Sequence, residues 1–239
     1  MHAVILAGGR GRRMGALSHK RQKGTLHFKG TSILAQIINS TLAQKDIETI
    51  WIATGYRGED VHRVVNEGYG KLLKRNKIRV IDAPHISGEL PRFNHVVGYM
   101  DSFPDCLVRG VDTLVPASVL TEMVRRIKAL AGDSVVVAAS RRIYIAPSHH
   151  RVHVRGDIVE AYDPPEQLPQ GSDPALHLDI GARYFPSRLV QIMANLHVPH
   201  GIDFIDGFLK SAVEHGELVH AHIFTEKWHH FGSGVDFLK

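Results

Sequence analysis

The chain has 239 residues, of which 44% are hydrophobic and 22% charged, so it can bury a sizeable core and is not a disordered protein. One cysteine, Cys106, excludes an internal disulfide and a multi-cysteine metal site. No apolar run approaches the roughly 20 residues of a membrane span, and the run at 3–7 is too short for a signal peptide. We therefore expect a cytoplasmic protein.

The formal net charge of +5 is distributed unevenly along the chain. The first 45 residues carry eight basic side chains and no acidic one, whereas the remaining 194 residues carry a net charge of −3. A cationic segment on a nearly neutral body is typical of a protein that binds a polyanion at one end. The charge alone does not separate a nucleotide from a nucleic acid.

Apolar runs alternate with helical spacings as far as residue 139. Strands are expected at 3–7, 49–53, 78–81, 106–108 and 134–139. Helices are expected at 32–42, from 59 to 65 or beyond, at 90–99 and at 117–130. This alternation predicts βαβ crossovers and a mostly parallel sheet.

The pattern changes after residue 140. Short strands are expected at 151–155 and 158–162, about a turn at Gly156 and Asp157, and a proline-rich stretch follows at 164–174. A strand at 177–185, a helix at 203–215 and a strand at 219–224 complete the prediction. No repeat or flexible linker separates the two parts, so we expect one domain over 1–239 with a less regular second half.

The most specific motif, residues 6–14 (LAGGRGRRM), follows the first expected strand. Glycines at this place let the backbone approach a ligand and turn its N–H groups toward phosphate oxygens. A Walker A loop is excluded because no window has the pattern G-x-x-x-x-G-K-[ST]. A Rossmann dinucleotide loop is disfavoured because Met14 replaces the third glycine and the first acidic residue is Asp46.

The motif resembles the L-A-G-G-x-G-x-R-[LM] signature of the sugar-1-phosphate nucleotidyltransferases. The similarity continues through Lys23, Gly30 and the helix expected at 32–42, and residues 50–56 (IWIATGY) are similar to the second strand of that family. The resemblance implies a Rossmann-like, three-layer αβα sandwich, with a nucleotide-binding half at 1–139 and an acceptor-binding half at 140–239. It also implies transfer of NMP from an NTP to a sugar, cyclitol or polyol 1-phosphate, with release of pyrophosphate.

The same resemblance assigns roles to residues of the first half. Arg13 would stabilise the leaving pyrophosphate, and Lys23 would stabilise the α-phosphate in the transition state. Asp112, after the strand expected at 106–108, would act in catalysis as the first ligand of Mg²⁺, or of Mn²⁺. The nucleotide would be bound by the first loop and by a later glycine: Leu6, Ala7, Gly8, Gly9, Arg10, Gly11 and Gly88.

The metal site departs from the family pattern in the second half of the chain. His230, in the sequence WHHFG, stands where a second metal-binding aspartate is expected. Magnesium prefers oxygen ligands, so three arrangements remain open. Asp236 completes the site, His230 completes it with a softer metal, or Asp112 is the only protein ligand.

The acceptor site departs as well. The lysine that many relatives use for the sugar phosphate is absent at 162–165, and Arg142 or Arg183 is a candidate replacement. Asp179, Gly181 and Arg183 belong to a segment that is similar to the N-x-G-x-Y-x-F element of the family. These four residues are the expected acceptor-binding residues.

Three alternative functions remain. The first is a cytidylyltransferase that acts on a phosphorylated alcohol, and the second is a non-catalytic, nucleotide-binding regulatory protein, which the histidine at 230 and the missing lysine favour. The third, an RNA-binding protein, lacks a recognisable module. We therefore expect an NTP and a small phosphorylated acceptor as partners, with no nucleic acid and no membrane. The oligomeric state stays open between a monomer and a homo-oligomer.

Overall fold

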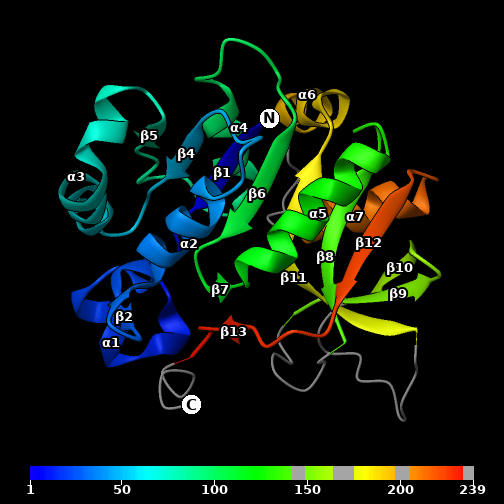
Figure 1. Ribbon diagram of the computed structural model, residues 1–239. Helices are drawn as coiled ribbons and strands as arrows, with labels where there is room; N and C mark the ends of the chain where they lie inside the picture. The colour runs from blue at the N-terminus through cyan, green and yellow to red at the C-terminus, as the bar shows by residue number, and fades with distance from the viewer. Residues whose placement is uncertain (142–148, 164–174, 197–204, 234–239) are drawn as a thin grey trace.

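The computed structural model describes residues 1–141, 149–163, 175–196 and 205–233. In this part of the chain, a sheet of nine strands forms the centre of the molecule, in the order β5-β4-β1-β6-β11-β8-β12-β10-β9 (Figure 1). Its strands, in chain order, are β1 (His2–Leu6), β4 (Ile50–Ala53), β5 (Ile78–Ile81), β6 (Cys106–Gly110), β8 (Val135–Ser140), β9 (Arg151–Arg155), β10 (Ile158–Asp163), β11 (Leu176–Phe185) and β12 (Val219–Phe224).

The first half of the sheet is parallel, as the sequence predicts. Strand β1 pairs in parallel with β4 and β6, and β4 pairs in parallel with β5. The crossovers contain α2 (Ile33–Leu42), α3 (Gly58–Lys74) and α4 (Glu89–Val97), and α5 (Ala117–Ala129) leads to β8. Because parallel strands share a direction, the loops that follow β1, β4, β5 and β6 meet at one edge of the sheet.

Local signals fix the ends of these helices. Helix α2 begins after Ser32, whose hydroxyl accepts a hydrogen bond from the Ala35 N–H at 3.2 Å. Pro116 stands immediately before α5, where its missing N–H and its fixed φ cost little. Helix α2 buries Ile33, Leu34, Ile37 and Ile38, and α5 buries an apolar face of the same kind.

Helices cover both faces of the sheet. Alternate residues of β1 enter two different cores, with Ala3 and Ile5 in one and Val4 and Leu6 in the other. The first core contains residues of α2, α3 and α5, and the second contains residues of α4, α6 (Ser187–Asn195) and α7 (Ile205–Glu214). The sequence analysis did not predict α6, which buries Leu189, Val190 and Met193.

The second half corrects the expected mostly parallel sandwich, because the sheet is mixed. Strand β11 lies between β6 and β8 and is antiparallel to both, and only β12 pairs in parallel, with β8. Residues at the start of β11 also pair with β9, so β11, β8, β12, β10 and β9 form a closed, barrel-like ring. A register shift between Asp179 and Arg183, with Gly181 at φ +74°, lets β11 bend into both partners.

Short elements surround the carboxyl edge of the sheet. The first loop contains the 3₁₀ turn η1 (Arg12–Met14), α1 (Ala16–Lys20) and the 3₁₀ turn η2 (Lys23–Thr25), followed by the ribbon of β2 (His27–Phe28) and β3 (Thr31–Ser32). A second ribbon joins β7 (Thr113–Leu114) to β13 (His229–His230), so the C-terminal segment lies beside Asp112. Among the described residues, no helix is long and apolar enough to cross a membrane.

Candidate active site

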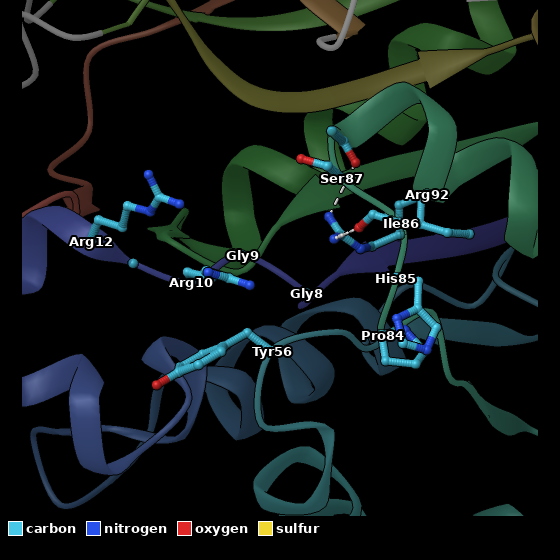
Figure 2. A pocket seen from close by; sticks show the side chains of 12 residues that line it. Gly8, Gly9, Arg10, Arg12, Tyr56, Pro84, His85, Ile86, Ser87 and Arg92 are labelled. Carbon is cyan, nitrogen blue, oxygen red and sulfur yellow. Dashed lines mark hydrogen bonds between the residues drawn. The ribbon is translucent and has the colours of Figure 1, made fainter.

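A cavity of about 740 Å³ opens at the carboxyl edge of the parallel strands. Its lining consists of residues 8–12, Tyr56, residues 84–88 and Arg92, which come from the loops after β1, β4 and β5 and from α4. In Figure 2 the backbone at Gly8 and Gly9 runs between Arg10 and Arg12 on one side and the 84–88 loop on the other. Four of the predicted nucleotide-binding residues of the first loop and Gly88 therefore line one cavity.

Gly8 is required by close backbone packing at the base of this cavity. A Cβ on Gly8 would lie 2.2 Å from Arg92 Nε and 2.7 Å from the Thr54 carbonyl oxygen. The Tyr56 N–H also donates to the Gly8 carbonyl at 3.1 Å. A Cβ on Gly55 would lie 2.7 Å from the Gly8 carbonyl oxygen, so the two backbones are in close contact. Gly9, in contrast, has open space around its Cβ position and faces the cavity. Leu6 and Ala7 lie beneath the cavity in the core rather than in its lining.

Arg92 ties the 84–88 loop to α4. Its guanidinium donates to the Gly88 carbonyl at 3.1 Å and to the Ile86 carbonyl (Figure 2). Its Nε is buried and has no hydrogen-bond partner among the described residues. Burial lowers the pKa of Arg92 from its ordinary value. The sequence analysis missed this residue, although an arginine between Leu90 and Phe93 on the apolar face of an expected helix is a signal that could have identified it.

Lys23 and Asp112, two of the three predicted catalytic residues, form an ion pair. Lys23 Nζ lies 2.8 Å from Asp112 Oδ2, and the two side chains are 11% and 31% exposed. Burial acts to raise the pKa of Asp112, but Lys23 and the neighbouring His230 and His149 together outweigh it and hold the pKa well below its ordinary range. The carboxylate is therefore ionised at neutral pH. Arg13, the third predicted residue, is exposed in η1 and does not line the cavity.

His230 lies near Asp112 through the pairing of β13 with β7, which places it opposite Thr113. Its ring packs perpendicularly on His149, with centroids 4.2 Å apart. Burial and the neighbouring His230 lower the pKa of His149 to about 3, so that imidazole is neutral at physiological pH. No group of three His, Cys, Asp or Glu side chains within the described ranges is placed to hold a metal. Asp236 lies outside those ranges.

The predicted acceptor residues Asp179, Gly181 and Arg183 contact one another. Arg183 Nε lies 2.8 Å from Asp179 Oδ2, and Asp179 Oδ1 accepts a hydrogen bond from the Gly181 N–H at 2.9 Å. The other end of the guanidinium contacts Asp206 and lies 3.8 Å from Glu89 Oε2. Arg183 thus sits among three carboxylates, two of which the sequence analysis did not identify. Arg142 lies outside the described residues.

Glu89 interacts electrostatically with both charged groups of the site. It is the first residue of α4 and lies within electrostatic reach of Arg183 and Asp206 and also of Asp112 and Lys23. Burial raises the pKa of Glu89 to about 7, against the opposing effect of Arg183. Glu89 also directly follows Gly88 of the cavity lining, so it connects the cavity to both charged groups.

Comparison with known proteins relates this site to nucleotidyl transfer. The family model of the MobA-like NTP transferase domain matches residues 3–171. A glucose-1-phosphate adenylyltransferase from Paraburkholderia phymatum is 37% identical over 70 residues, which are 29% of this chain and 17% of that protein. Its counterpart from Geobacter metallireducens is 26% identical over 108 residues, 42% of this chain and 26% of that protein. The matches thus span about a quarter or less of these relatives.

Two solved structures share the fold over nearly the whole chain. The inositol-1-phosphate CTP transferase from T. maritima superposes with a TM-score of 0.76 at 18% identity, covering 98% of this chain and 90% of that chain. A putative glucose-1-phosphate thymidylyltransferase from Bacillus anthracis gives a TM-score of 0.80 at 15% identity, covering 100% and 92%. At such identities the likeness concerns the fold, which is the Rossmann-like fold of nucleotidyltransferases.

Proposed function

Because this chain belongs to the family of MobA-like NTP transferase domains, we propose that it is a nucleotidyltransferase that acts on a sugar 1-phosphate or a similar small phosphate. It would transfer NMP from an NTP to the acceptor phosphate and release pyrophosphate. The observation that carries this proposal is the position of the Lys23–Asp112 pair at the same sheet edge as the glycine-lined cavity. A phosphate-binding loop and a fixed cation are the two parts that phosphoryl chemistry requires.

The NTP would occupy the cavity, with its phosphates against the backbone of residues 8–11 and its base toward the 84–88 loop. An oxygen of the acceptor phosphate attacks the α-phosphorus, and the bond from that phosphorus to the pyrophosphate oxygen breaks. Two anions approach each other in this step. Lys23 would offset the charge at the α-phosphate, and Arg13 would act on the departing pyrophosphate.

Asp112 would be the single protein ligand of a magnesium ion, whose other ligands would be phosphate oxygens and water. Asp112 is ionised and partly exposed, as such a ligand must be. When bound, Mg²⁺ would neutralise charge on the triphosphate. Imidazole nitrogens suit other divalent metals better, so we propose no magnesium contact for His230.

The acceptor would lie on the side of the Lys23–Asp112 pair that faces Glu89 and the Arg183 group. Asp179 and Asp206 already pair with Arg183. These three residues would therefore form a wall of the acceptor site and would not bind the acceptor phosphate directly. Glu89, whose side chain is 37% exposed, would accept a hydrogen bond from an acceptor hydroxyl.

A pyrophosphate-release screen tests the proposal directly. The full chain is incubated with Mg²⁺, each common NTP and a panel of acceptors that includes glucose 1-phosphate and inositol 1-phosphate, because the similar proteins act on such compounds. We expect release with at least one pair and, by mass spectrometry, the matching nucleotide-linked product. NTP binding without turnover on any acceptor would favour the non-catalytic alternative, and absence of both would refute the proposal.

A further inference from the structure

Gln22 directly precedes Lys23 and is fully buried. The nitrogen and the oxygen of its side-chain amide each have a hydrogen-bond partner. Its Nε2 donates to the Ala7 carbonyl at 2.8 Å, and its Oε1 accepts from the Gly24 N–H. Ala7 directly precedes Gly8, so one side-chain amide joins the entrance of the glycine loop to the segment that carries Lys23.

The backbone of Gln22 is held from a second direction, by α3. The Gln22 N–H donates to Asp60 Oδ2 at 2.9 Å, and Asp60 is 3% exposed. Arg57 and Arg63 also contact this carboxylate, at 2.8 and 3.1 Å. Burial acts to raise the pKa of Asp60, but the bonds from Arg57 and Gln22 outweigh it and the pKa lies below its ordinary value. The carboxylate is therefore a fixed anchor for Gln22.

The segment after Gln22 is packed against the end of β6. A Cβ on Gly24 would lie 2.2 Å from Val111 Cγ2, so the backbone of Gly24 touches the residue that precedes Asp112. The backbone that carries the Lys23 side chain is therefore fixed to the end of β1, to α3 and to the end of β6. This arrangement compensates for the flexible four-carbon side chain of lysine, which does not position its own charge.

We infer that Gln22 is a positioning residue that holds Lys23 at a set distance from the glycine loop and Asp112. The inference rests on the proposed function for its catalytic consequence. A displacement of about 1 Å in a catalytic group can cost about 10²-fold in rate, because the charge must coincide with the transition state. Nucleotide binding depends on the cavity lining, to which Gln22 does not belong.

Gln44 provides a matched control. It is also a buried glutamine, 4% exposed, with one bond to the Ser40 carbonyl and one from Thr121, each 3.2 Å long. These contacts join the end of α2 to α5, outside the cavity lining. Gln22→Met and Gln44→Met each remove a buried amide of the same size. We expect both to lower Tm, and only Gln22→Met to lower kcat by about 10²-fold, with KM for the NTP changed less than about threefold.

A double-mutant cycle tests whether Gln22 acts through Lys23. If it does, adding Gln22→Met to Lys23→Ala changes kcat by less than about threefold. An equal loss of kcat in both backgrounds would overturn the inference, and so would equal kcat in the Gln22→Met and Gln44→Met variants. Should Gln22→Met not fold, Gln22→Glu takes its place under the same criteria. That side chain has the same shape and keeps the acceptor for Gly24 while it removes the donor to Ala7.

A second measurement needs no turnover, so it separates this inference from the proposed function. Acetylation of lysines by acetic anhydride, followed by peptide mass spectrometry, reports how exposed each amine is. Lys23 is 11% exposed and paired, so it should react slowly in the wild-type chain. We expect Gln22→Met to accelerate labelling of Lys23 and to leave Lys71 unchanged, with no acceleration in Gln44→Met. Unchanged labelling of Lys23 would contradict the positioning role, whereas an inactive wild-type chain would refute only the proposed function.

Discussion

Lys23 and Asp112 are 89 positions apart in the chain and 2.8 Å apart in space. In the absence of substrate each neutralises the other, and an incoming phosphate would draw the ammonium away from the carboxylate. We expect Lys23→Ala to lower kcat by about 10²-fold or more, because a preorganised charge acts mainly in the transition state. Steady-state kinetics on the substrate pair found in the screen measures this effect.

Lys29→Ala is the control for that substitution. Lys29 is exposed and lies over the Phe28 ring, outside the cavity lining. The substitution Lys29→Ala removes one positive charge from the same cationic segment, but at a position outside the cavity lining. We therefore expect kcat to stay within about threefold of the wild type. Similar losses in both variants would mean that general charge, and not the position of Lys23, matters.

Gly8 and Gly9 give a second test at single residues. Alanine at Gly8 would place a methyl group 2.2 Å from Arg92 Nε and 2.7 Å from a backbone oxygen, whereas alanine at Gly9 meets no atom within 4 Å. We expect Gly8→Ala to reduce the free energy of unfolding by about 1–3 kcal/mol, as overpacking does. Gly9→Ala should stay within about 0.5 kcal/mol. Urea titration of both variants measures the difference, and equal stabilities would contradict the packing described for Gly8.

The sequence predicts those residues of this site that belong to a local motif, and it does not predict those that depend on contacts with distant segments. The glycines, Lys23 and Asp112 follow strand ends in a recognisable order, so a resemblance could assign them. Asp206 and Glu89 have no such pattern, because each acquires its role from Arg183, which is distant in the chain. Gln22 is similar: nothing in its neighbours indicates that its amide would meet the carbonyl of Ala7.

At the level of elements, strand and helix positions follow from periodicity, but strand order does not. The expected strand at 177–185 matches β11 closely, yet its place between β6 and β8, antiparallel to both, depends on pairings that no local pattern encodes. Its bend at Gly181 creates the barrel-like ring and brings Asp179 to Arg183. Helix α6 was missed because its three buried residues give only a short apolar repeat.

Helix α4 carries a prediction about pH, since Glu89 is its first residue. Burial raises the pKa of Glu89 to about 7 from an ordinary 4.5. Below pH 4.5 the group is protonated in both states, and its contribution to stability is complete. As pH rises through 7 the folded state has to ionise this half-buried carboxyl, so that contribution is lost.

Glu89→Gln removes this titration while it keeps the shape of the side chain. The difference in Tm between the variant and the wild type should therefore shift in favour of the variant between pH 4.5 and 7, and then level off. Asp206, whose pKa lies below its ordinary value at about 2, stays ionised in the folded state over this pH range and does not produce the change. Thermal melts at intervals of half a pH unit test this. A difference that stays constant across the range would show that Glu89 titrates normally.

For the whole molecule, the distribution of charge bears on the class of ligand. Eight basic residues and no acidic residue occupy the first 45 positions, and the remaining chain carries −3. Several of the basic residues lie at or near the cavity, among them Arg10, Arg12 and Lys23. Apart from Lys45, these basic residues all lie between positions 10 and 29, in the segment that follows β1 at one edge of the sheet. This compact arrangement suits one triphosphate.

Nucleic-acid binding would require a different distribution of charge. A protein that contacts Z phosphates of a duplex loses affinity with salt at a slope of about −0.9Z on logarithmic axes, so tight binding at moderate salt needs many contacts along a surface. We expect calorimetry to detect Mg²⁺-dependent binding of at least one NTP, and only weak, salt-sensitive association with RNA. The NTP signal should persist at salt concentrations that abolish the RNA signal, because the proposed site would hold the phosphates by backbone N–H groups within a cavity. Sub-micromolar RNA binding in moderate salt, together with no binding of any NTP or nucleotide sugar, would refute the enzyme assignment and favour the RNA-binding alternative.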